Sequence, residues 1–239
     1  MRVAITTSAV LVVVAIASAG SLSAEEPAVA YDYRERTRQI AFDPGRFFDG
    51  GSAQPPYMSI IYSGDDYGYP VYSIAVRKGC TSRDTGDARK TCGKRMVARM
   101  VRSPGDGETE RPRWRGAKLF AALAKQNPTD DDQLVAALDG YGLEWLEADI
   151  GACRSALDHL ARKNVSFFND PAVGELSLVL HADKITFDYR SEYLAHTRYY
   201  GQIKPENAGG WAAAFASSLE PCWVPSAAPK PWLEQATGG

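Results

Sequence analysis

The residues best suited to metal chemistry are two histidines and a carboxylate late in the chain. His181 and His196 lie within 16 residues of each other, and Asp183 follows His181 at a spacing of two. Two imidazoles and one carboxylate form a common ligand set for a redox or hydrolytic metal. The set predicts, as an alternative function, a small hydrolase or metal-dependent enzyme that uses His181, Asp183 and His196. A hairpin pattern described below argues against it, because that pattern places His181 and Asp183 at an exposed tip, and we expect no cofactor.

Three carboxylates in one strand pattern are the next candidates for catalysis. Glu144, Glu147 and Asp149 resemble the acidic residues of a glycosidase pair, and Glu147 and Asp149 share a strand face. Nothing in the sequence marks a sugar-binding aromatic platform beside them, so charges solvated on a strand are the favoured interpretation. The common hydrolase, protease and nucleotide-binding motifs are also missing from the chain. These observations favour a protein without catalytic activity.

Basic residues are concentrated in one part of the chain. Between Arg77 and Lys118 there are 13 Lys/Arg against 5 Asp/Glu, a balance of +8, in a chain whose net charge is −2. This stretch predicts a surface for an anionic polymer or an acidic protein of the cell envelope. The alternative, that the stretch folds onto the protein's own acidic helices, stays open. The whole chain is too acidic for a nucleic-acid-binding protein to be expected.

Two groups within the basic stretch are the candidate binding residues. Guanidinium groups around a tryptophan can hold phosphate or carboxylate and stack on a ring. The first group has this composition and consists of Arg111, Arg113, Trp114 and Arg115. The second group lies in and just after a polar loop between two cysteines and consists of Arg89, Lys90, Lys94 and Arg95.

The first 24 residues have the pattern of an export signal. Arg2 gives a positive start, residues 3–19 carry no charge, and Leu22-Ser23-Ala24 is a small-residue exit. A transmembrane anchor is the weaker alternative, because 17 apolar residues are at the lower limit of a span. We expect cleavage after Ala24, no span in the mature chain, and a location in the periplasm or outside the cell.

Four cysteines predict two disulfides in such an exported chain. Four cysteines allow three connectivities. The count is even and no C-x-x-C occurs, which disfavours a zinc site. Pairing between neighbours along the chain is the simplest choice, and it predicts the disulfides Cys80–Cys92 and Cys153–Cys222.

Hydrophobic periodicity predicts one domain over residues 57–220, with both strands and helices. Strands are expected at residues 57–62, 71–76, 95–101 and 143–150, the third with a helix as the alternative. Helices are expected at residues 116–126, 129–142, 153–163 and 207–219.

Residues 175–190 predict a β-hairpin. A two-residue turn at Ala182-Asp183 pairs three apolar positions of one strand with three of the other, which are Leu180 with Ile185, Leu178 with Phe187, and Leu176 with Tyr189. A shift of one residue would destroy all three pairs. Residues 193–200 are expected to add a third strand.

The two ends of the mature chain lack strong periodicity. Residues 25–56 are expected to be a loosely ordered lead-in with one strand near residues 39–42. Residues 221–239 are a Pro-rich tail, expected to lie on the surface through Trp223 and Trp232. The sequence thus predicts an α+β fold in which an antiparallel sheet of hairpins packs against three or four helices, stapled by two disulfides. It predicts an exported binding or interaction protein that contacts an anionic envelope component.

Overall fold

The computed structural model of the chain describes residues 31–48, 55–64, 68–105, 113–161, 183–190 and 196–233. The expected signal over residues 1–24 and the first strand of the expected hairpin, residues 175–182, lie outside this part of the chain.

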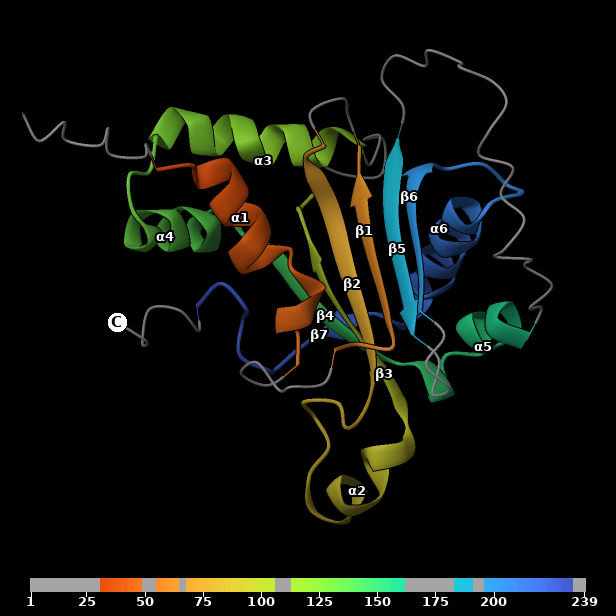
Figure 1. Ribbon diagram of the computed structural model, residues 1–239. Coiled ribbons are helices and arrows are strands. Elements are labelled where there is room, and N and C mark those ends of the chain that lie inside the picture. The colour runs from red at the N-terminus through yellow and green to blue at the C-terminus, as the bar shows by residue number, and fades with distance from the viewer. Residues whose placement is uncertain are drawn as a thin grey trace, which may run out of the picture. The chain divides into compact units, whose positions relative to one another are not determined.

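The described residues form one antiparallel sheet of seven strands in the order β6-β5-β1-β2-β3-β4-β7 (Figure 1). The strands are β1 Met58–Ser63, β2 Pro70–Lys78, β3 Met96–Arg102, β4 Glu144–Asp149, β5 Lys184–Arg190, β6 His196–Gln202 and β7 Val224–Pro225. The first four agree with the strands expected from periodicity, and the expected α+β fold class is confirmed.

Helices cover both sides of this sheet. They are α1 Tyr33–Ala41, α2 Gly86–Thr91, α3 Arg113–Gln126, α4 Asp131–Tyr141, α5 Arg154–Ala161 and α6 Ala208–Ser218. In Figure 1, α1, α3 and α4 lie on one side of β2, whereas α5 and α6 lie on the other side of the sheet. Successive residues of a strand point to opposite faces, so Ile74 and Val76 pack in the core under α6, while Ala75 packs in the core under α3 and α4.

Capping side chains set the helix ends that the sequence indicated. Asn207 caps α6, because its side-chain oxygen accepts a hydrogen bond from the backbone N–H of Gly210 at 2.9 Å. Asp130 caps α4, and its carboxylate accepts from the N–H of Gln133 at 2.8 Å. Gly142 ends α4 with φ +81°, a left-handed conformation that glycine adopts without strain.

The expected 175–190 hairpin is wrong in its pairing. Strand β5 has the expected alternation, with Ile185 and Phe187 fully buried. However, Phe187 lies opposite Ile60 of β1 on one side and opposite Tyr199 of β6 on the other. Both edges of β5 are therefore occupied, and Leu178 cannot pair with Phe187. Alternation defines the face that a strand buries, but it does not identify the strand beside it.

The N-terminal part of the described chain also differs from expectation. The strand expected near residues 39–42 is wrong, because these residues complete α1 and begin the turn after it. Asp32 caps α1 by accepting from the N–H groups of Arg34 and Glu35. Phe42 and Phe47 are almost fully buried beside α3 and α4. The segment thus contributes a helix and the three rings of Phe42, Phe47 and Phe48 to the core.

The C-terminal segment, residues 224–233, adds an edge strand and a core residue. Strand β7 pairs with β4, and Trp232 is fully buried instead of lying on the surface. The indole N–H of Trp145 donates to the carbonyl of Ala228 at 2.9 Å. Trp223 is half-buried against the core under α6.

Both expected disulfides are present. The Cα atoms of Cys80 and Cys92 are 5.0 Å apart, and those of Cys153 and Cys222 are 5.8 Å apart. The first lies within residues 79–95, a projection between β2 and β3 that we call the finger and that contains α2 (Figure 1). The second joins the residue before α5 to the end of the 3₁₀ turn after α6. Within the described ranges, every helix is too short or too polar to cross a membrane.

Candidate anion-binding pocket

The two described members of the alternative metal site, Asp183 and His196, lie far apart. His181 lies outside the described residues. Asp183 directly precedes β5, whereas His196 lies opposite Arg190 at the other end of that strand. Because a strand rises about 3.3 Å per residue, Asp183 and His196 are roughly 20 Å apart. These two residues therefore cannot bind the same ion.

His196 instead belongs to an ion cluster on the sheet. Its Nε2 lies 2.7 Å from Oδ1 of Asp188, and Nε of Arg198 donates to the other carboxylate oxygen at 3.1 Å. Burial raises the pKa of Asp188, but the hydrogen bonds from His196 and Arg198 outweigh it and lower the pKa below its usual range. Asp188 is therefore ionised at neutral pH and holds these side chains in place.

The residues of the first expected binding group do not form one described cluster. Arg111 lies outside the described residues, and Arg113 is the first residue of α3. Trp114 is 49% exposed. The guanidinium of Arg115 packs so closely on Gly105 that a Cβ at Gly105 would lie 2.6 Å from Nη2. Arg115 is thus packed on a neighbouring loop, which separates it from the exposed Trp114.

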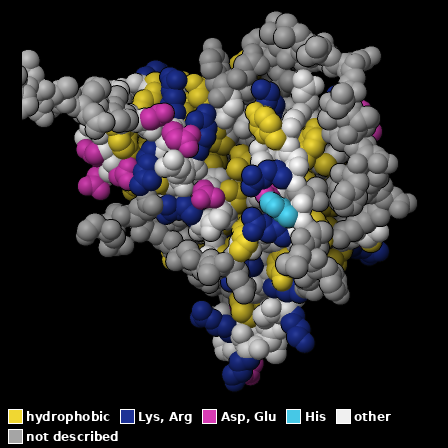
Figure 2. Space-filling view, in the orientation of Figure 1, with side chains coloured by type: hydrophobic (Ala, Val, Ile, Leu, Met, Phe, Trp, Pro, Cys, Tyr) yellow, Lys and Arg dark blue, Asp and Glu magenta, His cyan; other side chains and the backbone are white. Residues whose placement is uncertain are grey.

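The second expected group divides into three exposed cations and one half-buried cation. Arg89, Lys90 and Lys94 are exposed on the finger, and Lys90 is ion-paired with Asp87 of the same helix at 2.8 Å. Figure 2 shows Lys and Arg side chains over the finger, at the bottom of the view. Arg95, in contrast, forms ion pairs with Asp84 and Asp149 at 2.5 and 2.8 Å. The hydrogen bond from Arg95 lowers the pKa of Asp84. Arg95 therefore holds the base of the finger on β4, and its charge is paired with the protein's own carboxylates.

A buried charged pair lies beside the base of the finger. Arg99 of β3 and Glu147 of β4 are directly opposite each other in the sheet, and they are only 6% and 0% exposed. Arg99 Nε lies 3.9 Å from the Glu147 carboxylate. The expectation that Glu147 is a solvated strand charge is wrong. The C-terminal segment and the finger cover it, and neither contact can be inferred from β4 alone.

Arg99 is held by aromatic and backbone contacts. Its Nη1 donates to the carbonyl of Phe47 at 2.7 Å. Its guanidinium lies 4.7 Å from the ring centre of Phe48 and 6.0 Å from that of Trp145. Cations over aromatic faces are attracted by the ring quadrupole. The charge of Arg99 is thus fixed in place before any ligand arrives.

Glu147 connects three distant parts of the chain. Its carboxylate accepts from the backbone N–H of Ser82 at 2.9 Å, from the Ser82 hydroxyl at 2.6 Å, and from the Ser226 hydroxyl at 3.1 Å. The N–H of Ala227 donates to the Ser82 hydroxyl at 2.8 Å. Hydrogen bonds to a carboxylate are stronger than those between neutral groups. Glu147 therefore fastens the finger and the C-terminal segment to the sheet.

These contacts shape a polar pocket of about 430 Å³. Its walls come from the end of β2, the finger, β3 and the C-terminal segment. Four of its lining side chains are cationic, namely Arg77, Lys78, Arg89 and Arg99. Asp84 is the one carboxylate among the lining residues, and it is ion-paired with Arg95. The surplus of positive charge suits a carboxylate, sulfate or phosphate group.

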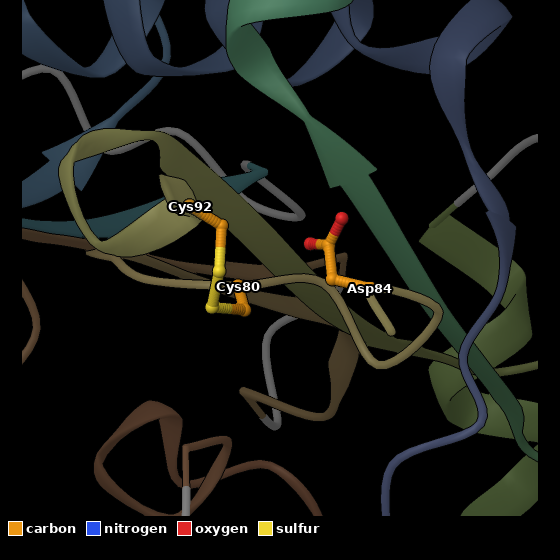
Figure 3. Close-up of side chains that lie close together, drawn as sticks. All are labelled: Cys80, Asp84 and Cys92. Carbon is orange, nitrogen blue, oxygen red and sulfur yellow. A yellow bond between two sulfur atoms is a disulfide. The ribbon is translucent and has the colours of Figure 1, made fainter. Parts of the chain in front are cut away.

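One group of potential metal ligands lies beside the pocket. Among the described residues, Cys80, Asp84 and Cys92 alone form a set of three such side chains close together. Figure 3 shows the two sulfur atoms bonded to each other and the Asp84 carboxylate beside them. Metal binding by cysteine requires a thiolate. A disulfide has none, so these residues do not form a metal site in the oxidised protein.

Comparisons of the chain with protein-family models, characterised proteins and solved structures find no match.

The sequence contains a signal for the two buried charges. Arg99 interrupts the apolar run of residues 97–101, and Glu147 stands between Leu146 and Ala148. A charge in the middle of an apolar strand is rarely buried without a partner. Pairing such charges across neighbouring strands could have suggested Arg99 with Glu147, although not Ser82 or Ser226.

Proposed function

We propose that this protein is an exported, non-catalytic binding protein whose pocket beside the finger holds an anionic group of a cell-envelope polymer. The observation that supports the proposal best is the convergence of Arg77, Lys78, Arg89 and Arg99 on one polar pocket. These cations come from β2, α2 and β3, so the fold brings together charges that are up to 22 positions apart in the sequence.

The chemistry of the pocket suits a polymer of repeated negative groups. Guanidinium groups bind carboxylate, sulfate and phosphate through paired N–H donors. Arg99 supplies a fixed, buried charge at the pocket wall, whereas Lys78 and Arg89 are exposed and reach toward solvent. A buried inner charge with exposed outer charges can engage one anionic group and the groups next to it on the same polymer.

Export is the part of the proposal that depends on the cysteines and the first 24 residues. Two disulfides are typical of proteins in an oxidising compartment. The charged start, apolar stretch and small-residue exit of residues 1–24 fit a signal peptide. Together they support a location in the periplasm or outside the cell. No observation favours the alternative metal-dependent enzyme, because Asp183 and His196 are at opposite ends of β5.

Retention on heparin, a sulfated polymer, tests the proposal. Wild-type protein should bind heparin at low salt and elute as salt rises, because surface charges are screened within about 10 Å at 0.1 M. The double variant Lys78→Gln, Arg89→Gln should weaken binding roughly tenfold through the loss of two pocket charges. The control, Lys90→Gln with Lys94→Gln, removes two charges from the same finger outside the pocket lining and should change affinity less than about twofold.

Three results would contradict this assignment. Wild-type protein that is not retained at low salt has no such site. Equal losses in the two double variants would show that the general charge of the finger, and not the pocket, attracts the polymer. Loss of retention only when Arg111, Arg113 and Arg115 are changed to Gln would move the site to the beginning of α3. The wild-type protein and the variants should have equal melting temperatures, so that a difference in retention does not come from a difference in stability.

A further inference from the structure

A second hollow lies on the other half of the sheet, away from the finger. On the side opposite α6, the strands β1, β5 and β6 carry no covering α-helix among the described residues, since α1, α3 and α4 lie beside β2 (Figure 1). The short 3₁₀ helix Pro44–Arg46 contacts β1. The burial of β1 alternates accordingly, with Ile60 buried under α6 and Ile61 half-exposed on the open face.

A groove of about 410 Å³ runs between this open face and α1. Its apolar lining includes Phe42 and Pro44 beside α1, Ile61 on the floor, and Tyr200 of β6. Tyr200 is 70% exposed, the highest exposure among the large hydrophobic side chains of the described residues. In Figure 2, hydrophobic side chains lie among Lys and Arg side chains over this part of the sheet. A hollow of this size with apolar walls is typical of a small-molecule site.

The strand register gives the dimensions of the floor. Ile61 lies opposite Thr186, and Thr186 lies opposite Tyr200, so one row crosses three strands. Neighbouring strands are about 4.8 Å apart, which makes this row roughly 10 Å wide. Lys184 is two residues from Thr186 along β5, or roughly 7 Å. A flat molecule of two fused rings is about as long as this row, so it can lie over the three side chains with a substituent close to Lys184.

The groove lining carries two cations, Arg38 and Lys184, and two carboxylates, Glu35 and Asp43. Arg38 is ion-paired with Glu35 at 3.5 Å. The Asp43 carboxylate accepts the backbone N–H of Gly45 at 2.9 Å, which caps the turn after α1. Lys184 has no ion pair with any described residue. The electrostatically complementary ligand therefore carries its negative charge at the Lys184 end.

We propose that this groove binds a small amphipathic carboxylate, with its flat apolar body over Ile61 and against Tyr200 and its anionic end at Lys184. This site is independent of the pocket beside the finger, because the two share no lining residue. The exposed ring of Tyr200 supplies apolar contact, and Lys184 selects for the charge.

Calorimetric titration with 2-naphthoate and with the uncharged 2-naphthylmethanol tests the proposal. Wild-type protein should bind both, and naphthoate about fivefold more tightly, as expected for one exposed ion pair. Lys184→Gln should remove that preference without weakening 2-naphthylmethanol. Tyr200→Ala should weaken both roughly tenfold. The exposed residue Lys204 is outside the groove lining, and Lys204→Gln is the matched control that should change neither.

Several outcomes would overturn the assignment. The absence of saturable naphthoate binding to the folded wild-type protein would show that the groove holds no such ligand. Binding that survives Tyr200→Ala would place the ligand elsewhere. Loss of naphthoate binding in the Lys78→Gln, Arg89→Gln variant would place it in the pocket beside the finger. Tyr200 and Lys184 are at the surface, so unchanged melting temperatures should confirm that both variants fold.

Discussion

At the scale of single residues, Glu147 is the buried carboxylate that holds the finger and the C-terminal segment on the sheet. Periodicity along β4 correctly placed Glu147 and Asp149 on one strand face, the face that also carries Trp145. It could not show that this face is covered, because the cover comes from Ser82 and Ser226, which are 65 and 79 positions away. A sequence pattern indicates the strand or helix to which a residue belongs and the face on which it lies. Whether that face is buried depends on the segments that pack over it.

Removing Glu147 should strongly destabilise the protein. Glu147→Ala leaves the buried guanidinium of Arg99 without its carboxylate and removes the acceptor of three hydrogen bonds. Breaking a buried ion pair from one side costs about 3–5 kcal/mol. Glu144→Ala on the same strand removes a half-exposed partner of Arg102 and should cost less than about 1 kcal/mol. Urea unfolding of both variants measures the difference, and similar costs would mean that Glu147 is accessible to water.

At the scale of elements, local patterns were sufficient for most helices and strands. Trp211 and Phe215 of α6 and Leu219, its C-cap residue, recur at intervals of four, and all three pack in the core as this spacing indicates. The strands that pair with β5 could not be predicted from such patterns. Its neighbour β1 precedes it by more than 100 positions, and any strand with the same alternation satisfies the same register rule.

Substitutions on the two faces of β5 should differ sharply in cost. Phe187 is fully buried, and its ring centre lies 5.5 Å from that of Trp211. Phe187→Asp puts an unpaired charge in this core and should cost more than about 4 kcal/mol or prevent folding. Thr186→Asp lies on the open face and should cost less than about 1 kcal/mol. Thermal unfolding measures both variants, and equal damage would show that this half of the sheet is covered on both faces.

At the scale of the whole molecule, the candidate pocket is a product of contacts that are remote in sequence. Its residues come from the turn after α1, from β2, the finger and β3, and from the C-terminal segment. The sequence identified the basic stretch and the disulfide that closes the finger, because both are local features. It could not identify Arg77, Lys78 and Arg99 as pocket residues, because their convergence depends on the sheet and on the C-terminal segment.

The two disulfides should therefore have separable effects on binding and stability. In the chain-entropy model, the closed loops of Cys80–Cys92 and Cys153–Cys222 contribute about 3 and about 4 kcal/mol to the free energy of unfolding. Cys80 lines the pocket, and its loop presents Ser82 and Arg89. Changing Cys80 and Cys92 to Ser should thus weaken heparin retention of the folded protein as well as its stability.

Changing Cys153 and Cys222 to Ser is the matched comparison. This disulfide lies under α5 and α6, in the core on the other side of the sheet from Arg99 and Glu147. Its loss should lower the urea midpoint at least as much as loss of the finger disulfide, because it closes the longer loop. It should leave heparin retention unchanged in the folded protein, because β7 and the hydrogen bonds of Ser226 and Ala227 hold the C-terminal segment at the pocket independently of Cys222. If instead this second variant loses retention while it remains folded, the anion site lies nearer α5 and α6 than to the finger.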